Sequence, residues 1–176
     1  MMPEIGDIID CRKVSSIGHF VLTLGIKTKR DKIEVMYYIV TSRVYTVFPR
    51  IIDFFNDCLS RNYGRFMVAF PKEKDKEKIT LHGRLCDAFF LDRESHYKGC
   101  LDMDSMIVIN QNPETIDFET FRRWHENNMV AHRSRLESND LIKFMETVKF
   151  SLNINGENKA YACKNYKEFK KGKKVI

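Results

Sequence analysis

The chain has 176 residues, of which 43% are hydrophobic and 31% are charged. A chain of this length usually folds as one domain and buries a sizeable core. Its 13 Phe and 7 Tyr residues require burial, which excludes a disordered, collagen-like or coiled-coil protein.

The net charge of +6 is distributed unevenly along the chain. Residues 164–176 contain six lysines and one glutamate, a local charge of +5, so residues 1–163 carry only +1. The overall basicity therefore does not by itself make the folded body a nucleic-acid binder. We predict a single α+β domain over residues 1–163, followed by a Lys-rich tail at 164–176.

Several classes of protein are excluded by what the sequence lacks. No apolar run approaches the roughly 18–20 residues that span a bilayer, and residues 1–7 do not resemble a secretory signal. The five cysteines form no C-x-x-C pair, and His82 and His96 are too isolated to suggest a metal site. We expect reduced thiols in a cytoplasmic protein with no metal and no cofactor.

Three N-terminal segments are rich in the β-branched and aromatic residues favoured in strands. They are residues 6–11, 19–26 and 33–41. Residues 27–32 are charged and are predicted to form a loop, so the second and third segments are expected to pair as an antiparallel hairpin.

The rest of the chain mixes strand and helix patterns. We expect a short amphipathic helix at 51–59, strands at 65–70, 85–91 and 105–110, helices beginning near Asp117 and Ser138 or Asn139, and a last short strand at 160–163. The pattern predicts an antiparallel barrel or curled sheet over residues 1–110 and a helical portion over residues 111–155.

The strand predicted at 33–41 is followed by a candidate phosphate site. Thr41, Ser42 and Arg43 lie at its end, where polar side chains emerge at the rim of a sheet. Two hydroxyl groups and a forked, permanently charged guanidinium suit a phosphate. Alternatively, the two hydroxyl groups only satisfy the backbone of a turn.

Positive charge concentrates around this strand. Residues 11–50 carry a local charge of +6. The candidate RNA-binding residues among them are Arg12, Lys13, Lys29, Arg30 and Arg50. Tyr37, Tyr38, Tyr45 and Phe48 are interleaved with these cations, and aromatic faces beside cations hold unstacked bases. In the alternative interpretation the aromatic residues belong to the core and the cations form a solvated face.

The order of these motifs resembles the PemK/MazF group of toxin endoribonucleases and the related ToxN-type toxins. The matching segments are G-D-I at 6–8, a strand at 20–22, I-V-T-S-R-V at 39–44 and a later strand at 101–108. The resemblance implies a small antiparallel SH3-like β-barrel, here with added C-terminal helices. The chain departs from the group in having Gly18-His19 in place of an Arg-Pro pair, and a longer insertion at 50–100.

The resemblance also implies metal-independent cleavage of RNA, in which the 2′-OH attacks the adjacent phosphate and leaves a 2′,3′-cyclic phosphate. In this interpretation His19 is the base or acid, Arg43 holds the phosphate, and Thr41 or Ser42 stabilises the oxyanion. Because the group's Arg is replaced, either His19 takes its place or catalysis is absent. His19 is otherwise an ordinary core or surface histidine.

The expected partners are RNA, an antitoxin of protein or RNA, and a second copy of the chain, with no membrane. The alternative function is a non-catalytic module that binds nucleic acid or protein, such as a defence or counter-defence factor. A protein interface is also open at residues 117–135, where Trp124 and several arginines lie. A helix that packs on its own sheet predicts the same pattern, and we favour that interpretation.

Overall fold

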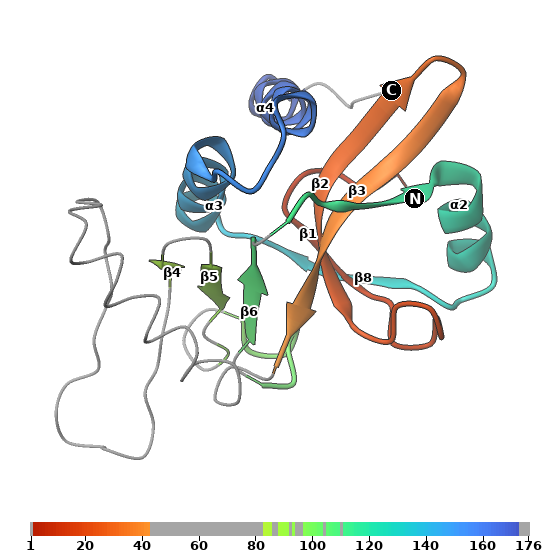
Figure 1. The fold of residues 1–176 in the computed structure, drawn as a ribbon. Coiled ribbons are helices and arrows are strands. Elements are labelled where there is room, and N and C mark those ends of the chain that lie inside the picture. The colour runs from red at the N-terminus through yellow and green to blue at the C-terminus, as the bar shows by residue number, and fades with distance from the viewer. Residues whose placement is uncertain are drawn as a thin grey trace, which may run out of the picture.

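A long antiparallel hairpin runs through the middle of the computed structural model (Figure 1). The structure describes residues 2–42, 83–85, 88–91, 93, 97–103, 105–109 and 111–172. Strands β2 (Phe20–Lys29) and β3 (Lys32–Thr41) form the hairpin, in register from Phe20 opposite Val40 to Lys29 opposite Lys32. The predicted hairpin is therefore confirmed.

The predicted loop at 27–32 is wrong, because only Arg30 and Asp31 lie between the two strands. The strand continues through this charged segment since Lys27 is buried against the C-terminal helix. The Nζ atom of Lys27 donates to Asn158 Oδ1 at 3.0 Å and lies 3.3 Å from a carboxylate oxygen of Glu157. The charged residues thus indicated a loop, whereas tertiary contacts stabilise a strand in this segment.

The hairpin belongs to one eight-stranded sheet. Seven strands follow the order β4-β5-β6-β3-β2-β1-β8, and the eighth, β7, pairs with β3 beside this path. The other strands are β1 (Asp7–Asp10), β4 (Gly83–Leu85), β5 (Ala88–Leu91), β6 (Ser105–Val108), β7 (Glu114–Asp117) and β8 (Ala131–Arg135). All ladders between these strands are antiparallel. The outer edge of β3 is shared, because Glu34–Tyr37 pair with β7 and Val40–Thr41 pair with β6.

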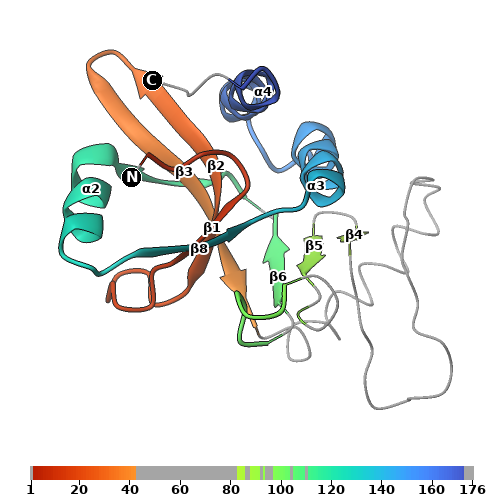
Figure 2. The same ribbon diagram turned by 180° about the vertical axis from the view of Figure 1, so that it is seen from behind.

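Helices cover both faces of this curled sheet (Figures 1 and 2). Helices α3 (Ser138–Phe150) and α4 (Gly156–Lys170) lie on one side, where Leu22, Tyr38 and Phe144 join the larger core cluster. Helix α2 (Phe118–Glu126) lies on the other, where Val21, Tyr37 and Phe121 form a second cluster. Neighbouring residues of β2 therefore serve opposite cores, as strand alternation requires.

The segment predicted as helical, 111–155, also contains two strands. β7 pairs with β3, and β8 pairs with β1 at an edge of the sheet, so the sheet is not confined to residues 1–110. The sequence of β8 has no alternation of apolar and polar residues, so it does not indicate a strand. Two ion pairs hold it to β1 instead: Arg133 to Asp10 and Arg135 to Asp7, each at 2.7 Å.

The predicted strand at 160–163 is wrong, because these residues lie inside α4. Asn155 starts the helix: its side chain accepts a hydrogen bond from the backbone N–H of Asn158 at 2.8 Å. An Asn-Gly pair at 155–156 is as typical of a helix end as of a helix start, which accounts for the error. Much of the predicted Lys-rich tail, through Lys170, is therefore helical.

Several predictions fall partly or wholly outside the described residues. The helix at 51–59, the strand at 65–70, His82, His96, Tyr45 and Phe48 lie there. The strand predicted at 85–91 is replaced by the β4–β5 pairing, with Leu85 opposite Ala88. Among the described helices, none has the length and apolar character needed to cross a bilayer.

Gly25 permits the close approach of α4 to the sheet. Its φ is +84° at a bulge in the β2–β3 pairing, and a Cβ there would lie 2.6 Å from Asn165 Nδ2. Asn165 donates from that atom to the carbonyl groups of Leu24 and Ile26, both at 2.8 Å. The missing side chain therefore allows α4 to dock on the β2 backbone.

We expect Gly25→Ala to destabilise the protein more than Gly99→Ala does. Both glycines have a left-handed φ, which costs a larger residue about 1–2 kcal/mol, but nothing lies within 4 Å of a Cβ at Gly99. Crowding of Asn165 adds about 1–3 kcal/mol at Gly25 alone. Urea denaturation measures the difference, and equal losses would contradict the proposed docking contact.

Candidate functional site

Three strand ends meet at one end of the sheet. Asp10 of β1 pairs with Phe20 of β2, and Phe20 pairs with Val40 of β3. The residues just beyond this row form what we call the β1–β3 rim: Arg12, Lys13, His19, Thr41 and Ser42. The structure thus brings together five of the predicted site residues.

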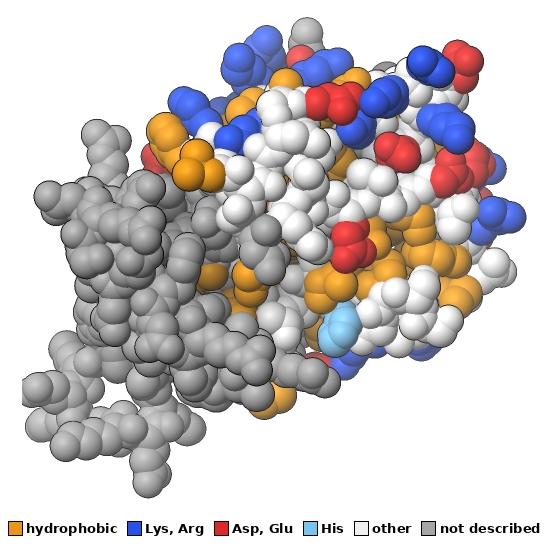
Figure 3. Space-filling model, in the orientation of Figure 1, with side chains coloured by type: hydrophobic (Ala, Val, Ile, Leu, Met, Phe, Trp, Pro, Cys, Tyr) orange, Lys and Arg blue, Asp and Glu red, His pale blue; other side chains and the backbone are white. Residues whose placement is uncertain are grey.

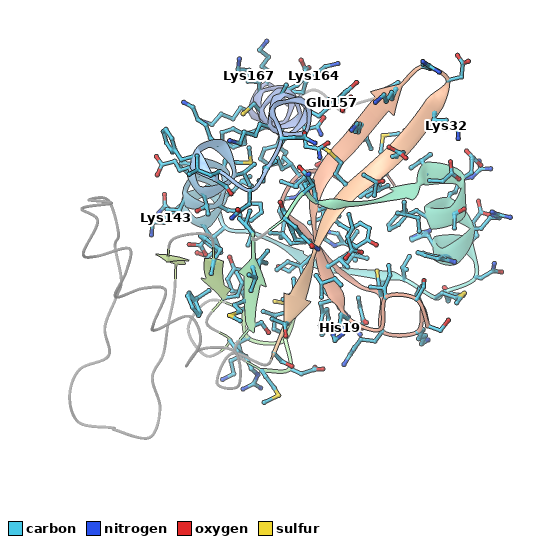
Figure 4. All side chains as sticks on the ribbon, in the orientation of Figure 1. His19, Lys32, Lys143, Glu157, Lys164 and Lys167 are labelled. Atoms are coloured by element: carbon cyan, nitrogen blue, oxygen red, sulfur yellow. The ribbon has the colours of Figure 1, made fainter. Side chains whose placement is uncertain are left out.

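His19 is exposed and directly precedes β2 (Figure 4). Its carbonyl oxygen accepts a hydrogen bond from the N–H of Cys11 at 3.0 Å, which fixes the backbone. The β2–β3 register ends with Phe20 opposite Val40, so His19 and Thr41 are the next residues along the two strands beyond that pair. Among the described residues, the His19 imidazole has no hydrogen-bond or ion-pair partner.

The rim residues occupy two faces of the sheet. Phe20 belongs to the core cluster beneath α3 and α4, so alternation directs His19 and Thr41 to the α2 side. Arg12 lies on the opposite side, with its guanidinium carbon 4.6 Å from the centre of the Phe20 ring. Alternation also places Ser42 on the Arg12 side.

Arg12 is already engaged by acidic side chains. Its Nε and Nη2 atoms donate to the two carboxylate oxygens of Asp10 at 3.0 and 2.8 Å, and its Nη1 atom contacts Asp102. Arg133 donates to the same carboxylate at 2.7 Å. These guanidinium groups, Arg12 first, hold the pKa of Asp10 well below its usual range. Because the charges cancel, Arg12 is a poor phosphate contact.

Of the other predicted RNA-binding residues that the structure describes, Lys13 lies at the rim, whereas Lys29 and Arg30 lie far from it. Lys13 is exposed, and its Nζ atom lies 3.5 Å from the carbonyl oxygen of Asn128, which leaves its charge available. Lys29 and Arg30 lie at the far tip of the hairpin, about 30 Å from the rim at about 3.3 Å per strand residue. Lys29 lies 3.4 Å from a carboxylate oxygen of Glu157.

Arg43 and Arg50 fall outside the described residues. Arg43 follows Ser42 directly in the chain, and Arg50 is seven residues further along. The role predicted for each therefore stays a prediction.

The aromatic residues near the rim belong to the core. Tyr37 and Tyr38 are buried, and their hydroxyl groups donate at 2.9 Å to Glu114 Oε2 and to the carbonyl oxygen of Gln111. Burial, together with Glu114, raises the pKa of Tyr37. These rings offer no open face to a base, so for them the core interpretation is confirmed.

Helix α2 packs on its own sheet. Phe121 is buried in the core cluster on that side, and Phe118 and Trp124 pack against it. This confirms the interpretation favoured for residues 117–135.

The described residues contain no group of three or more His, Cys, Asp or Glu side chains arranged to hold a metal ion. Cys11, Cys100 and Cys163 are free thiols. Burial raises the pKa of Cys11 to about 12, so at neutral pH it is a protonated core residue and not a nucleophile. The chemistry available at the rim is therefore that of imidazole, hydroxyl and cationic side chains.

Asp10 and Arg133, which form an ion pair beside the rim, were not among the predicted site residues. Their signal was present in the sequence, because two acids in the strand at 6–11 face two arginines two residues apart at 133 and 135. Such complementary charges on adjacent strands stabilise pairing. The segment containing the arginines was assigned to a helical region, so the match was not made.

Comparison with family models, with curated proteins and with solved structures finds no match to this chain. The resemblance to the PemK/MazF group therefore stays a prediction that depends on short motifs. Any function has to be inferred from the rim and from the charged surfaces around it.

The Asp10 ion pairs predict a specific pH dependence of stability. The folded-state pKa of Asp10 is depressed, so its stabilising contribution is complete above the unfolded-state pKa of about 3.9 and is lost as the pH falls toward the folded-state pKa. We expect Asp10→Asn to cost about 1–3 kcal/mol at pH 7 and to flatten the loss of stability below about pH 4.

The matched control is Asp102→Asn, because Asp102 is 65% exposed and, among the described residues, pairs only with Arg12. An exposed pair contributes about 0–1 kcal/mol, so the urea midpoint of this variant should stay close to that of the original chain. Equal effects of the two substitutions would show that Asp10 does not organise the rim.

Proposed function

We propose that the protein is a metal-independent endoribonuclease that acts at the β1–β3 rim. The observation that supports this proposal is that the last pair of the hairpin, Phe20 and Val40, is flanked by exposed His19 on one strand and by Thr41 on the other. Ser42 and Arg43 follow Thr41 in the chain. A proton-transfer group and phosphate-binding groups thus lie on adjacent strands, at a point where RNA has access from solvent.

The proposed reaction is an internal transfer on RNA. His19 accepts the proton of a 2′-OH, the O2′–P bond forms, and the P–O5′ bond breaks, which leaves a 2′,3′-cyclic phosphate. The leaving 5′-oxygen takes a proton from the protonated imidazole or from water. Imidazole suits this exchange because its ordinary pKa lies close to neutral.

The other groups stabilise the charge that develops on the phosphate. Arg43 supplies a permanent cation, and the hydroxyl group of Thr41 or Ser42 donates to an equatorial oxygen. Thr41 shares the face of His19 and is the better placed of the two. Lys13 contacts the RNA backbone, while Arg12 supports the site through Asp10.

Further proposals about the fold, the location and the partners follow from the resemblance to the PemK/MazF group. We infer that the curled sheet is an SH3-like barrel with added C-terminal helices. The long hairpin, whose outer edge is divided between β6 and β7, supports this inference. A cytoplasmic location, an antitoxin and a homodimer belong to the same proposal.

A second candidate function is non-catalytic binding of nucleic acid. It is favoured by the Asp10 carboxylate, which neutralises Arg12 and Arg133 beside the rim. With few uncompensated cations, the rim offers little stabilisation to a charged transition state. Binding without cyclic-phosphate products would support this candidate.

Cleavage is tested by incubating the full chain with labelled RNA in EDTA and analysing the product ends. We expect 2′,3′-cyclic phosphate ends. We expect His19→Ala to lower the rate about 10²–10⁴-fold through loss of proton transfer, and Arg43→Ala to lower it about 10²–10³-fold through loss of charge stabilisation.

The matched control is His125→Ala, because His125 is a partly exposed histidine on α2 rather than at the rim. Its rate should equal that of the original chain. A His19→Ala variant that is fully active would remove His19 from the site, and an original chain that yields no cyclic-phosphate ends would refute the proposed reaction.

A further inference from the structure

The two sides of helix α4 differ completely in character. Asn158, Ala162 and Asn165 recur at helical spacing and are buried against the body of the protein. Lys164, Lys167 and Lys171 recur at the same spacing and are exposed. At 100° per residue these three lysines point away from the buried side. We call them the α4 lysine face.

The α4 lysine face is held on a fixed element. Asn165 donates from its side chain to two carbonyl groups of β2, and Lys27 donates to Asn158 from the same strand. The Tyr161 hydroxyl group also donates to the carbonyl oxygen of Thr28. The three lysines are therefore arranged about 4.5 and 6 Å apart along the helix axis, and do not belong to a loose tail.

Positive charge on α4 is largely uncompensated. The segment 156–171 contains five lysines against Glu157 and Glu168. Glu157 is already shared between Lys27 and Lys29 of β2. Within the described part of the chain, no carboxylate lies within ion-pair distance of Lys164, Lys167 or Lys171. Figure 3 shows Lys and Arg side chains gathered over α4.

We propose that the α4 lysine face binds the phosphate backbone of single-stranded RNA. Regularly spaced, uncompensated ammonium groups on a rigid helix complement a polyanion, and such contacts depend on charge rather than base sequence. The inference rests on the proposed function for the choice of RNA as ligand, but it does not require that the rim cleaves it.

An anionic membrane is the less favoured partner. A helix that lies on a membrane needs an apolar face to bury among the lipids. The apolar side of α4 is already occupied, because Ala162 is fully buried and Tyr161 and Phe169 pack against the core. Lysines predominate among the exposed residues of α4, with Glu157 near its start and Ala160 as the other exposed side chains, which suits a phosphate backbone.

The test compares binding of a fluorescent 2′-O-methyl RNA oligonucleotide, which cannot be cleaved by 2′-OH attack, across a range of salt concentrations. We expect Lys164→Gln/Lys167→Gln/Lys171→Gln to weaken binding about tenfold or more at low salt. Loss of three phosphate contacts should reduce the slope of log affinity against log salt by about 2, at about 0.7 per contact on a single strand.

The matched control removes three exposed cations elsewhere: Lys98→Gln/Arg122→Gln/Arg123→Gln. This variant has the same net charge and should keep the original slope. An equal loss in both variants would show that only net charge matters and would overturn the proposal. Unchanged RNA binding in the α4 variant, or no RNA binding by the original chain, would also overturn it.

The two proposals fail in different ways. If the α4 variant binds RNA normally while His19→Ala abolishes cleavage, the proposal for the α4 lysine face is wrong and the proposal for the rim is retained. If the original chain binds RNA through α4 but yields no cyclic phosphate, the reaction proposed for the rim is wrong and the proposal for the α4 lysine face is retained. If the α4 substitutions abolish binding to vesicles of phosphatidylserine and phosphatidylcholine but leave RNA binding intact, the partner is a membrane and the RNA proposal is overturned.

Discussion

The register of the β2–β3 hairpin is the constraint on which the rest of the structure depends. Pairing Phe20 with Val40 directs alternate side chains of both strands to two separate cores. A shift of one residue would exchange those faces and expose both. The same register brings His19 and Thr41 together at one end and places Lys29 and Arg30 at the other. Fold and candidate site are therefore set by a single pairing.

Charge has three different roles in this molecule. Between β1 and β8, acids and arginines pair across the strands and hold an edge strand that has little apolar character. On β2, Lys27 is buried and anchors α4. On the outer side of α4, Lys164, Lys167 and Lys171 have no acidic partner within the part of the chain that the structure describes. The overall charge of +6 does not distinguish these roles, because it depends on which carboxylates the fold brings close to each cation.

The elements that are predictable from sequence are those that alternate or repeat locally. The strands at 19–26 and 33–41 and the helices near 118 and 138 have clear apolar periods, and all four are present. β8 and α4 were missed, because the acidic partners of Arg133 and Arg135 (Asp10, Asp7 and Glu4) are far away in sequence, and Asn155-Gly156 is ambiguous without its tertiary context. For the site, the sequence located the strand end at Thr41. It did not show that Arg12 is neutralised, since Asp102 is distant in the chain and a sequence separation of two does not reveal that the Asp10 carboxylate turns toward Arg12.

The central claim is that RNA contacts the β1–β3 rim and the α4 lysine face, and not the hairpin tip. The most direct measurement is a titration of the isotopically labelled full chain with non-cleavable 2′-O-methyl RNA, followed through backbone amide chemical shifts. The account predicts shifts at His19, Thr41 and Lys167, with the amides of residues 29–32 unchanged. Shifts confined to residues 29–32, or no shifts at saturating RNA, would contradict it.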